Sequence, residues 1–298
     1  MQVEVAIVGG SFAGLAAAMQ LVRGRRSVVV IDAAKPRNRY AAHSHGIFCL
    51  DGKSPAEINA TAIAQLQQYP KFTLMRGEAL SVERQSDRRF VLQTTAGDHI
   101  VAQKLILATG LQDELPDIEG LAKHWGKSAV HCPYCHGYEL ADRELGVLAT
   151  SALSVHQALM IPDWGKTTLF TQNMLRLDDE QLSLLSKRGV SIEHRPIVRV
   201  NGDEVIDSVT LADGTERHIN GLYVTPKVRV SNPLVSALQC ELVESPLGDI
   251  IQVDEFKQTS VADVYAAGDI SNPMQNGSLA ITSGVMAGIS AHQSLMFA

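Results

Sequence analysis

The first 32 residues contain the pattern that most restricts how this chain can fold. An apolar strand, Val3 to Val8, runs directly into Gly9-Gly10-Ser11-Phe12-Ala13-Gly14. An alanine-rich helix follows from Leu15 to Arg23, and a second strand, Val28 to Ile31, ends at Asp32. A strand, a glycine turn, a helix and a second strand form a βαβ unit, which requires a parallel sheet. The pattern predicts an α/β fold that binds a dinucleotide at its first turn.

The positions in this turn have separate physical roles. Gly9 allows the tight turn, Gly14 allows the helix to pack closely on the strand, and the first N-H groups of the helix face a pyrophosphate. Asp32 is placed to accept hydrogen bonds from a ribose. Ser11 occupies the position of the middle glycine in the usual G-x-G-x-x-G pattern. We expect its small side chain still to let a phosphate approach.

A second motif, Cys132-Pro133-Tyr134-Cys135-His136-Gly137-Tyr138-Glu139, indicates redox chemistry. Two thiols three positions apart can close and reopen a small disulfide ring, which carries two electrons. The same letters also contain the haem attachment string Cys-x-x-Cys-His, half of a zinc site, and a glutaredoxin-like Cys-Pro-Tyr-Cys. We disfavour haem because no export signal is recognised, zinc because Cys49 and Cys240 are lone, and glutaredoxin because the motif lies mid-chain.

Composition describes an ordinary globular protein. The 298 residues are 45% hydrophobic and 19% charged, which suffices for two domains with separate cores. The formal net charge of -6 does not favour binding to nucleic acid or to an anionic membrane. No run of about 18 apolar residues occurs, and Met1 leads straight into a strand, so we expect a cytoplasmic protein. In that reducing compartment a Cys-x-x-Cys pair is more often catalytic than structural.

Three further stretches complete the predicted first domain. A buried strand ends in Ala108-Thr109-Gly110, where small residues let the backbone lie flat against a cofactor. Another strand closes on Gly268-Asp269, where the carboxylate is suited to a ribityl hydroxyl or a water beside the phosphates. A long helix from Ser278 to Leu295 directs the positive end of its dipole, near Leu279 and Ala280, at the cofactor ring.

Residues 144 to 193 repeat the alternation of strands and helices, and hairpin signals follow at Asn201-Gly202 and Asp213-Gly214. A second dinucleotide would need glycines at the strand-to-helix corner, Ala149-Thr150-Ser151-Ala152-Leu153-Ser154, which has none. A 2′-phosphate would need an arginine cluster just after residue 171, and the stretch Gln172-Asn173-Met174-Leu175-Arg176 has one arginine. The second domain therefore has the order of strands and helices of a nicotinamide-binding domain, but it lacks the glycines and arginines that would contact the cofactor phosphates.

The βαβ unit, the Ala-Thr-Gly strand end, the mid-chain Cys-x-x-Cys and the C-terminal Ala-Gly-Asp occur in the order seen in low-molecular-weight thioredoxin reductases. The chain resembles that family over nearly its whole length. The resemblance implies an α/β fold of two Rossmann-like (three-layer ββα) nucleotide-binding domains, the second inserted into the first. The FAD-binding domain would comprise residues 1–112 and 225–298, and the NAD(P)H-like domain residues 113–224. It further implies a homodimer in which Cys135 lies nearest the flavin and Cys132 exchanges with substrate.

Two departures modify this expectation. His136 stands where the family typically has an aspartate, and a histidine titrates near neutral pH and can take a proton from the attacking thiol. The Cys-His-Gly-Tyr-Glu context is similar to fungal and bacterial dithiol oxidases that use flavin and oxygen. The strand-to-helix corner at residues 149–154 lacks the glycines that a second dinucleotide would need. We therefore expect an FAD-dependent thiol/disulfide oxidoreductase that uses NADPH poorly. The alternatives are an NADPH-dependent thioredoxin reductase and a non-enzymatic FAD redox sensor.

The basic loop after Asp32 adds two candidates, Arg39 for a phosphate and His45 for the cofactor ring, unless the loop is simply solvated. The predicted catalytic residues are Cys132, Cys135 and His136, and no metal ligand is predicted. The predicted FAD-binding residues are Gly9, Gly10, Ser11, Ala13, Gly14, Asp32, Ala33, Arg39, His45, Thr109, Gly110, Gly268, Asp269, Leu279 and Ala280. The expected partner is a thioredoxin-like protein or a small-molecule dithiol or disulfide.

Overall fold

The computed structural model describes residues 1–297 and divides into two compact units. The first unit comprises Met1–Arg39, Pro55–Gln112 and Val228–Ala298, and the second comprises Tyr40–Ser54 and Asp113–Lys227. Residue 298, the last of the expected first domain, lies outside the described residues. The division differs from the expected one mainly at residues 40–54, which group by their contacts with the second unit.

The first unit is built on a sheet of seven strands. Four parallel strands run in the order β3-β2-β1-β6, β5 and β4 continue antiparallel beyond β6, and β19 pairs parallel with the last residues of β6. The strands are β1 (Gln2–Val8), β2 (Val28–Asp32), β3 (Phe72–Arg76), β4 (Ala79–Arg84), β5 (Phe90–Thr94), β6 (His99–Leu107) and β19 (Val264–Ala266). Val8 is in register with Ile31 and with Leu107, and Leu107 with Ala266. The carboxyl ends of β1, β2, β6 and β19 therefore meet at one edge of the sheet.

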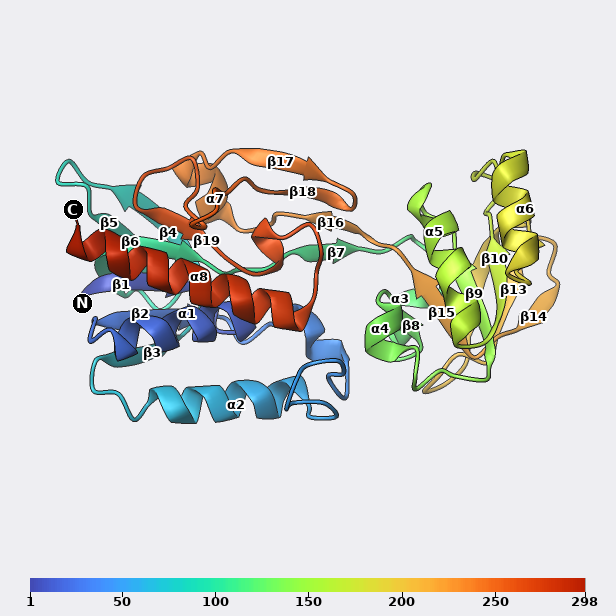
Figure 1. Cartoon of the computed structure of the whole chain (residues 1–298), viewed down its shortest axis with the longest axis horizontal. Helices are drawn as coiled ribbons and strands as arrows, with labels where there is room; N and C mark the ends of the chain where they lie inside the picture. The colour runs from blue at the N-terminus through green and yellow to red at the C-terminus, as the bar shows by residue number, and fades with distance from the viewer. Residues whose placement is uncertain (298) are drawn as a thin grey trace. The chain divides into compact units, whose positions relative to one another are not determined.

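Helices cover one face of this sheet, and a mixed layer covers the other. Figure 1 shows α8 beside α1, with α7, β17 and β18 on the opposite side of the sheet. The elements are α1 (Phe12–Arg23), α2 (Pro55–Leu66), α7 (Pro233–Leu238), α8 (Gly277–Met296), β17 (Leu242–Ser245), β18 (Gly248–Ile251) and the 3-10 turns η1 (Arg37–Tyr40) and η3 (Asp269–Ser271).

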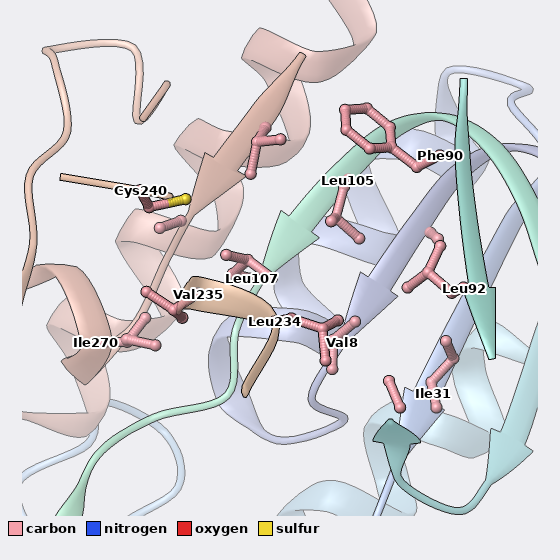
Figure 2. Close-up of a cluster of buried hydrophobic side chains, with 14 of the residues drawn as sticks. Val8, Ile31, Phe90, Leu92, Leu105, Leu107, Leu234, Val235, Cys240 and Ile270 are labelled. Carbon is pink, nitrogen blue, oxygen red and sulfur yellow. The ribbon is translucent and has the colours of Figure 1, made fainter. Parts of the chain in front are cut away.

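The two faces carry separate hydrophobic cores because side chains alternate along each strand. Val5 and Ile7 of β1 pack toward α1 and α8, whereas Ala6 and Val8 pack toward the opposite layer. Figure 2 shows this second core, in which Leu105 and Leu107 of β6 lie with Leu234, Val235 and Cys240.

On the helical face, α8 approaches α1 at glycines. A Cβ on Gly284 would lie 2.1 Å from the Ala13 carbonyl oxygen, and one on Gly288 would lie 2.6 Å from the Ala17 carbonyl oxygen. No side chain fits at either point, so these two glycines set the close approach of the helices.

The second unit has a five-stranded parallel sheet in the order β11-β10-β9-β15-β8 and a three-stranded antiparallel sheet, β12-β13-β14. Its strands are β8 (Ala129–Val130), β9 (Glu144–Leu148), β10 (Lys166–Phe170), β11 (Ser191–Glu193), β12 (Ile197–Asn201), β13 (Ser208–Leu211), β14 (Glu216–His218) and β15 (Gly221–Val224). Its helices are α3 (Leu121–His124), α4 (Pro133–His136), α5 (Leu153–Met160), α6 (Asp179–Lys187) and the 3-10 turn η2 (Ile161–Asp163).

This unit also has three layers. One core lies between the two sheets and includes Leu222 and Val209, and a second core joins the parallel sheet to α5 and α6 through Ala158 and Leu185. Where the chain passes between the units, β7 (Gln112–Glu114) and β16 (Lys227–Arg229) pair with each other. The predicted fold class, two Rossmann-like α/β domains with the second inserted into the first, is confirmed.

Several local expectations need correction. The first helix begins at Phe12 instead of Leu15, because Ser11 already adopts the extended backbone of an N-cap. Asn201-Gly202 is not a tight hairpin: residues 202–207 form a longer loop that buries Ile206. By contrast, Asp213-Gly214 does turn β13 into antiparallel β14, with Gly214 at a positive φ of 83°. Among residues 1–297, no helix has the length and apolar character needed to cross a bilayer.

Candidate active site and cofactor cradle

The Cys pair lies where the shortest strand of the second unit turns into a one-turn helix. Cys132 is the N-cap of α4 with extended backbone (φ -97°, ψ 116°), and Pro133 occupies the first turn, where its missing N-H costs nothing. The helical turn brings the two Cα atoms to 5.3 Å, and Cys132 and Cys135 form a disulfide. Both cysteines are partly buried. Local geometry alone thus places the two sulfurs within bonding distance.

The surroundings hold this turn in place. A Cβ on Gly137 would lie 2.7 Å from the Trp164 ring, and the Tyr134 ring meets Trp164 edge-on with centroids 5.7 Å apart. The Gln157 amide donates a hydrogen bond to the carbonyl of His131, just before the motif, at 2.8 Å. The dithiol turn is therefore packed against η2 and tied to α5.

His136 follows the pair directly and is partly buried. Burial lowers the pKa of its imidazole, the negative charge of Glu139 acts in the opposite direction, and the positive charge of His45 lowers it further. The net pKa lies below the ordinary value of 6.5. A neutral imidazole at neutral pH is a proton acceptor, which suits His136 to take a proton from a thiol.

In the first unit, the predicted cofactor residues gather at the edge where four strands end. Gly9 has a φ of 109°, and a Cβ there would lie 2.1 Å from the Ala108 carbonyl oxygen, so only glycine fits. Gly10 N-H donates to the Asp32 carboxylate at 3.2 Å. Ser11 caps α1 without a side-chain hydrogen bond among the described residues, so its hydroxyl does not occupy the first N-H groups of the helix. This turn presents backbone donors suited to a phosphate.

The Asp32 carboxylate has more partners within the chain than the sequence implies. Its second oxygen forms an ion pair with Arg76 at the end of β3, and the Ala34 N-H donates to its first oxygen at 3.1 Å. Ala33 beside it is exposed. The sequence analysis did not predict that Arg76 would pair with Asp32. The available signal was that Arg76 ends β3, the parallel strand next to β2.

The ends of β6 and β19 complete the edge. The Thr109 hydroxyl is buried and has no hydrogen-bond partner within the described part of the chain, and a Cβ on Gly110 would meet open space. Gly268 has a φ of 83°, and its N-H donates to the Ser283 hydroxyl at 2.8 Å. An orphaned buried hydroxyl beside an open glycine face is what a missing ligand group would leave.

Asp269 and the start of α8 are joined by a residue that sequence reasoning also missed. Arg37 donates to the Asp269 carboxylate at 2.9 Å and to the Gln275 side-chain oxygen at 2.6 Å. The N-H groups of Ser278 and Leu279 donate to the Asn276 side chain, and Ala280 N-H donates to the Asn276 carbonyl. The predicted Leu279 and Ala280 therefore lie in a capped first turn, and their role toward a flavin stays a prediction.

Two further predicted cofactor residues contact other parts of their own units, and their role toward a flavin stays a prediction. The exposed Arg39 donates to the carbonyl of Pro36 at 2.9 Å, within its own 3-10 turn. His45 belongs to the second unit, where its ring lies 3.4 Å from the carboxylate of Glu139. His45 is thus grouped with the dithiol turn, a contact between distant segments that sequence spacing does not reveal.

The corner at residues 149–154 differs from the glycine turn of the first unit. The Thr150 N-H donates to the Ser154 hydroxyl at 3.1 Å, and the Leu153 N-H donates to the Ser151 hydroxyl at 3.3 Å. Two backbone donors of this corner, those of Thr150 and Leu153, are therefore already satisfied by the chain itself. For residues 1–297, no group of three His, Cys, Asp or Glu side chains is arranged to hold a metal ion.

Comparison with known proteins places these features in a family. Residues 3–288 match the model of the pyridine nucleotide-disulphide oxidoreductases. The chain is 34% identical to thioredoxin reductase tcpT of Claviceps purpurea, over 99% of this chain and 94% of that protein. It is 31% identical to thioredoxin reductase sirT of Leptosphaeria maculans, over 96% and 92%. The crystal structure of an oxidoreductase from Agrobacterium tumefaciens matches with a TM-score of 0.95 and 42% identity, over 100% and 99%.

These matches span nearly the whole chain, both units and the dithiol turn included, so the predicted resemblance is confirmed. The chain belongs to the pyridine nucleotide-disulphide oxidoreductase family and is a thioredoxin reductase-like flavin disulfide oxidoreductase.

Proposed function

We propose that this enzyme relays two electrons between FAD and a substrate dithiol or disulfide through Cys132 and Cys135, and that it uses NADPH poorly. The observation that carries the proposal is the Cys132–Cys135 disulfide on a helical turn followed at once by His136, whose pKa burial lowers. Thiol–disulfide exchange requires a disulfide that a thiolate can attack and a base that takes the proton of the attacking thiol, and this turn supplies both.

The exchange balances without an outside reagent. His136 takes the proton of a substrate thiol, the thiolate attacks the sulfur of Cys132, and the Cys132–Cys135 bond breaks to leave Cys135 as a thiolate. The Cys135 thiolate takes the proton of the second substrate thiol, which attacks the mixed disulfide and releases Cys132 as a thiolate that receives the proton held by His136. The substrate loses two electrons and two protons and gains a disulfide, while the protein pair becomes a dithiol. The same steps in reverse reduce a disulfide substrate.

FAD, which the family implies, fits the strand edge of the first unit. Gly9, Gly10 and the start of α1 would hold its pyrophosphate, Asp32 its ribose, and Asp269 its ribityl side. The orphaned Thr109 hydroxyl and the open face of Gly110 support the fit. When bound, FAD supplies a two-electron acceptor or donor for the thiol pair.

Two observations support weak use of NADPH. The serine hydroxyls at the 149–154 corner occupy the backbone donors of Thr150 and Leu153. Beyond β11, the Arg195 guanidinium is held by Glu193 at 2.6 Å and by Asp213 at 2.6 Å, so it is not available to a 2′-phosphate. A phosphate without matched donors binds weakly because it gives up its water without replacement.

The proposed partner is a dithiol or disulfide, carried by a thioredoxin-like protein or by a small molecule, and the proposed assembly is a homodimer. Aromatic and apolar side chains of the second unit support a substrate with apolar surface: Phe48 is 92% exposed, Tyr138 86% and Tyr134, between the two cysteines, 74%. Exposed aromatic residues of this kind commonly mark a contact surface.

An anaerobic spectral titration tests the proposal. We expect dithiothreitol to bleach the flavin absorbance of the purified protein quickly, NADPH to bleach it slowly or not at all, and the substitutions Cys132→Ser and Cys135→Ser to abolish the response to dithiothreitol. The exposed Cys49→Ser variant is the matched control and should behave as the wild type. Rapid bleaching by NADPH would instead identify an NADPH-dependent thioredoxin reductase; the tcpT and sirT relatives are named thioredoxin reductases.

A further inference from the structure

Beside the dithiol turn, the second unit holds two ionisable groups that the exchange chemistry does not use. The imidazole Nε2 of His45 lies 3.4 Å from the carboxylate of Glu139, and its Nδ1 lies 3.6 Å from that of Asp51. His45 is largely covered, with 21% of its side chain exposed. Glu139 follows His136 by three positions, on the stretch that continues from α4. The ion pair therefore joins two segments that are about 90 residues apart, a separation large enough that only tertiary packing brings them together.

The loop that carries His45 is internally ordered. The Ser44 N-H donates to the Lys53 carbonyl at 2.8 Å, and the Gly46 N-H donates to the Asp51 carboxylate at 2.8 Å. Gly46 has a positive φ of 71°, and a Cβ there would lie 3.8 Å from the Tyr134 carbonyl oxygen. The loop at residues 40–54 is thus pinned at its ends and contacts the helical turn of the Cys pair.

The charges around His136 act with opposite signs. Burial lowers its pKa, Glu139 raises it and His45 lowers it. The charge of Glu139 also acts on the hydroxyl of Tyr223 on β15, which is buried and has no hydrogen-bond partner among residues 1–297. Burial and the charge of Glu139 both raise the pKa of that hydroxyl, so Tyr223 stays neutral and supplies no competing charge. The charged groups that face His136 are therefore Glu139 and His45, with Asp51 acting on His45.

We propose that Glu139 and His45 are positioning residues for His136: their contact at 3.4 Å links the loop at residues 40–54 to the base beside the dithiol and sets how readily that base accepts a proton. Glu139 raises the pKa of His136 and His45 lowers it, so the two groups act against each other on the same base. The role rests on the proposed function of His136, and it makes proton transfer depend on the position of a loop distant in sequence.

The decisive test is a titration of His136 in the reduced protein, with FAD bound and histidine labelled at the imidazole Cε1, followed by NMR. The His136 signal is assigned from the variant His136→Asn. We expect Glu139→Gln to shift the His136 midpoint to lower pH and His45→Asn to shift it to higher pH. The acidic limb of kcat/KM for a small dithiol should move in the same two directions, because that limb reports the base in the free enzyme.

Three further variants separate this electrostatic role from a structural one. Glu139→Asp keeps the charge and should return the midpoint to that of the wild type. Glu144→Gln and His156→Asn are matched controls in the same unit: Glu144 pairs with Lys166 at 2.9 Å, and His156 is exposed on α5. Neither substitution should move the midpoint. If Glu139→Gln does not fold, His45→Asn tests the proposal alone.

A midpoint that does not move in His45→Asn, or that moves in the same direction in His45→Asn and Glu139→Gln, overturns the proposal. The proposed function fails by a different result, namely dithiol turnover that survives Cys132→Ser and Cys135→Ser. The two failures are distinguishable because the NMR titration requires no turnover.

Discussion

A buried ion pair behind the cofactor edge allows a quantitative prediction. Asp263 immediately precedes β19 and is 8% exposed, and its carboxylate accepts a hydrogen bond from Lys104 of β6 at 2.5 Å. Lys104 is 6% exposed, and the Leu105 N-H donates to the Asp263 carbonyl at 3.0 Å. The pair joins the two strands whose ends present Thr109 and Asp269. Losing it should weaken both the first unit and its hold on FAD.

Asp263→Asn is the suitable perturbation. Asp263 has a positive φ of 73°, a backbone conformation that asparagine tolerates better than most residues. Removing one partner of a buried ion pair usually costs about 3–5 kcal/mol, because the other charge stays buried. The amide oxygen of asparagine still accepts from Lys104, so we expect the lower end, about 3 kcal/mol. At roughly 2–4 °C per kcal/mol for a unit of this size, the melting temperature should fall by about 6–12 °C.

The same substitution changes the pH dependence. Burial by itself raises the pKa of Asp263, but hydrogen bonds from Lys104 and from Arg88 outweigh burial and bring the pKa below its ordinary 3.8. A carboxyl whose pKa is lowered by folding contributes stability above its ordinary pKa, and this contribution is lost as the pH falls through the folded value. Asp263→Asn removes that contribution, so the difference from the wild type should be largest at neutral pH and should shrink in acid.

The assay is thermal unfolding with saturating FAD, followed by circular dichroism and by release of flavin fluorescence. Asp87→Asn is the control, because Asp87 pairs with Arg89 at 2.5 Å but at the surface, where such pairs contribute little. Lys104→Met removes the buried ammonium, so the double variant should be more stable than Asp263→Asn alone. A melting temperature of Asp263→Asn within about 1 °C of the wild type, or a double variant less stable than Asp263→Asn, would refute the reasoning.

Two other predictions concern the cofactor cradle and the second unit. Thr109→Val removes a buried hydroxyl that has no partner within residues 1–297; we expect unchanged or higher stability without FAD and FAD affinity lower by about 1 kcal/mol, roughly fivefold, measured by flavin fluorescence titration. Equal affinity in the two proteins would show that this hydroxyl does not meet the cofactor. A hydrogen bond from Arg195 holds the pKa of Glu193 at about 2, so this carboxylate contributes stability above 4.5 that is lost as the pH falls toward 2. Arg195→Gln should therefore raise the pH at which acid unfolds the protein, followed by circular dichroism, and an unchanged midpoint would contradict this account.

The features that sequence predicted well are those set by neighbours along the chain. The βαβ unit follows from apolar periodicity and from a glycine turn, and the strand ends at Thr109 and Gly268 meet because the carboxyl ends of paired parallel strands lie at the same edge. The Cys132–Cys135 turn is equally local, since one helical turn spans the two residues. For the glycine turn and the dithiol turn, the hydrogen bonds and steric limits that decide the conformation lie within a few residues.

Tertiary structure decided what joins distant segments. His45 lies beside Glu139, about 90 residues away, because its loop folds next to the dithiol turn, and its role at the cofactor ring stays a prediction. Arg37 reaches Asp269 and Arg76 reaches Asp32, and neither pairing follows from spacing. Which charged side chains form an ion pair depends on their distance and burial in the folded protein, and both are set only when the layers pack together. Sequence therefore determined the scaffold and the redox pair, while packing determined which charges surround them.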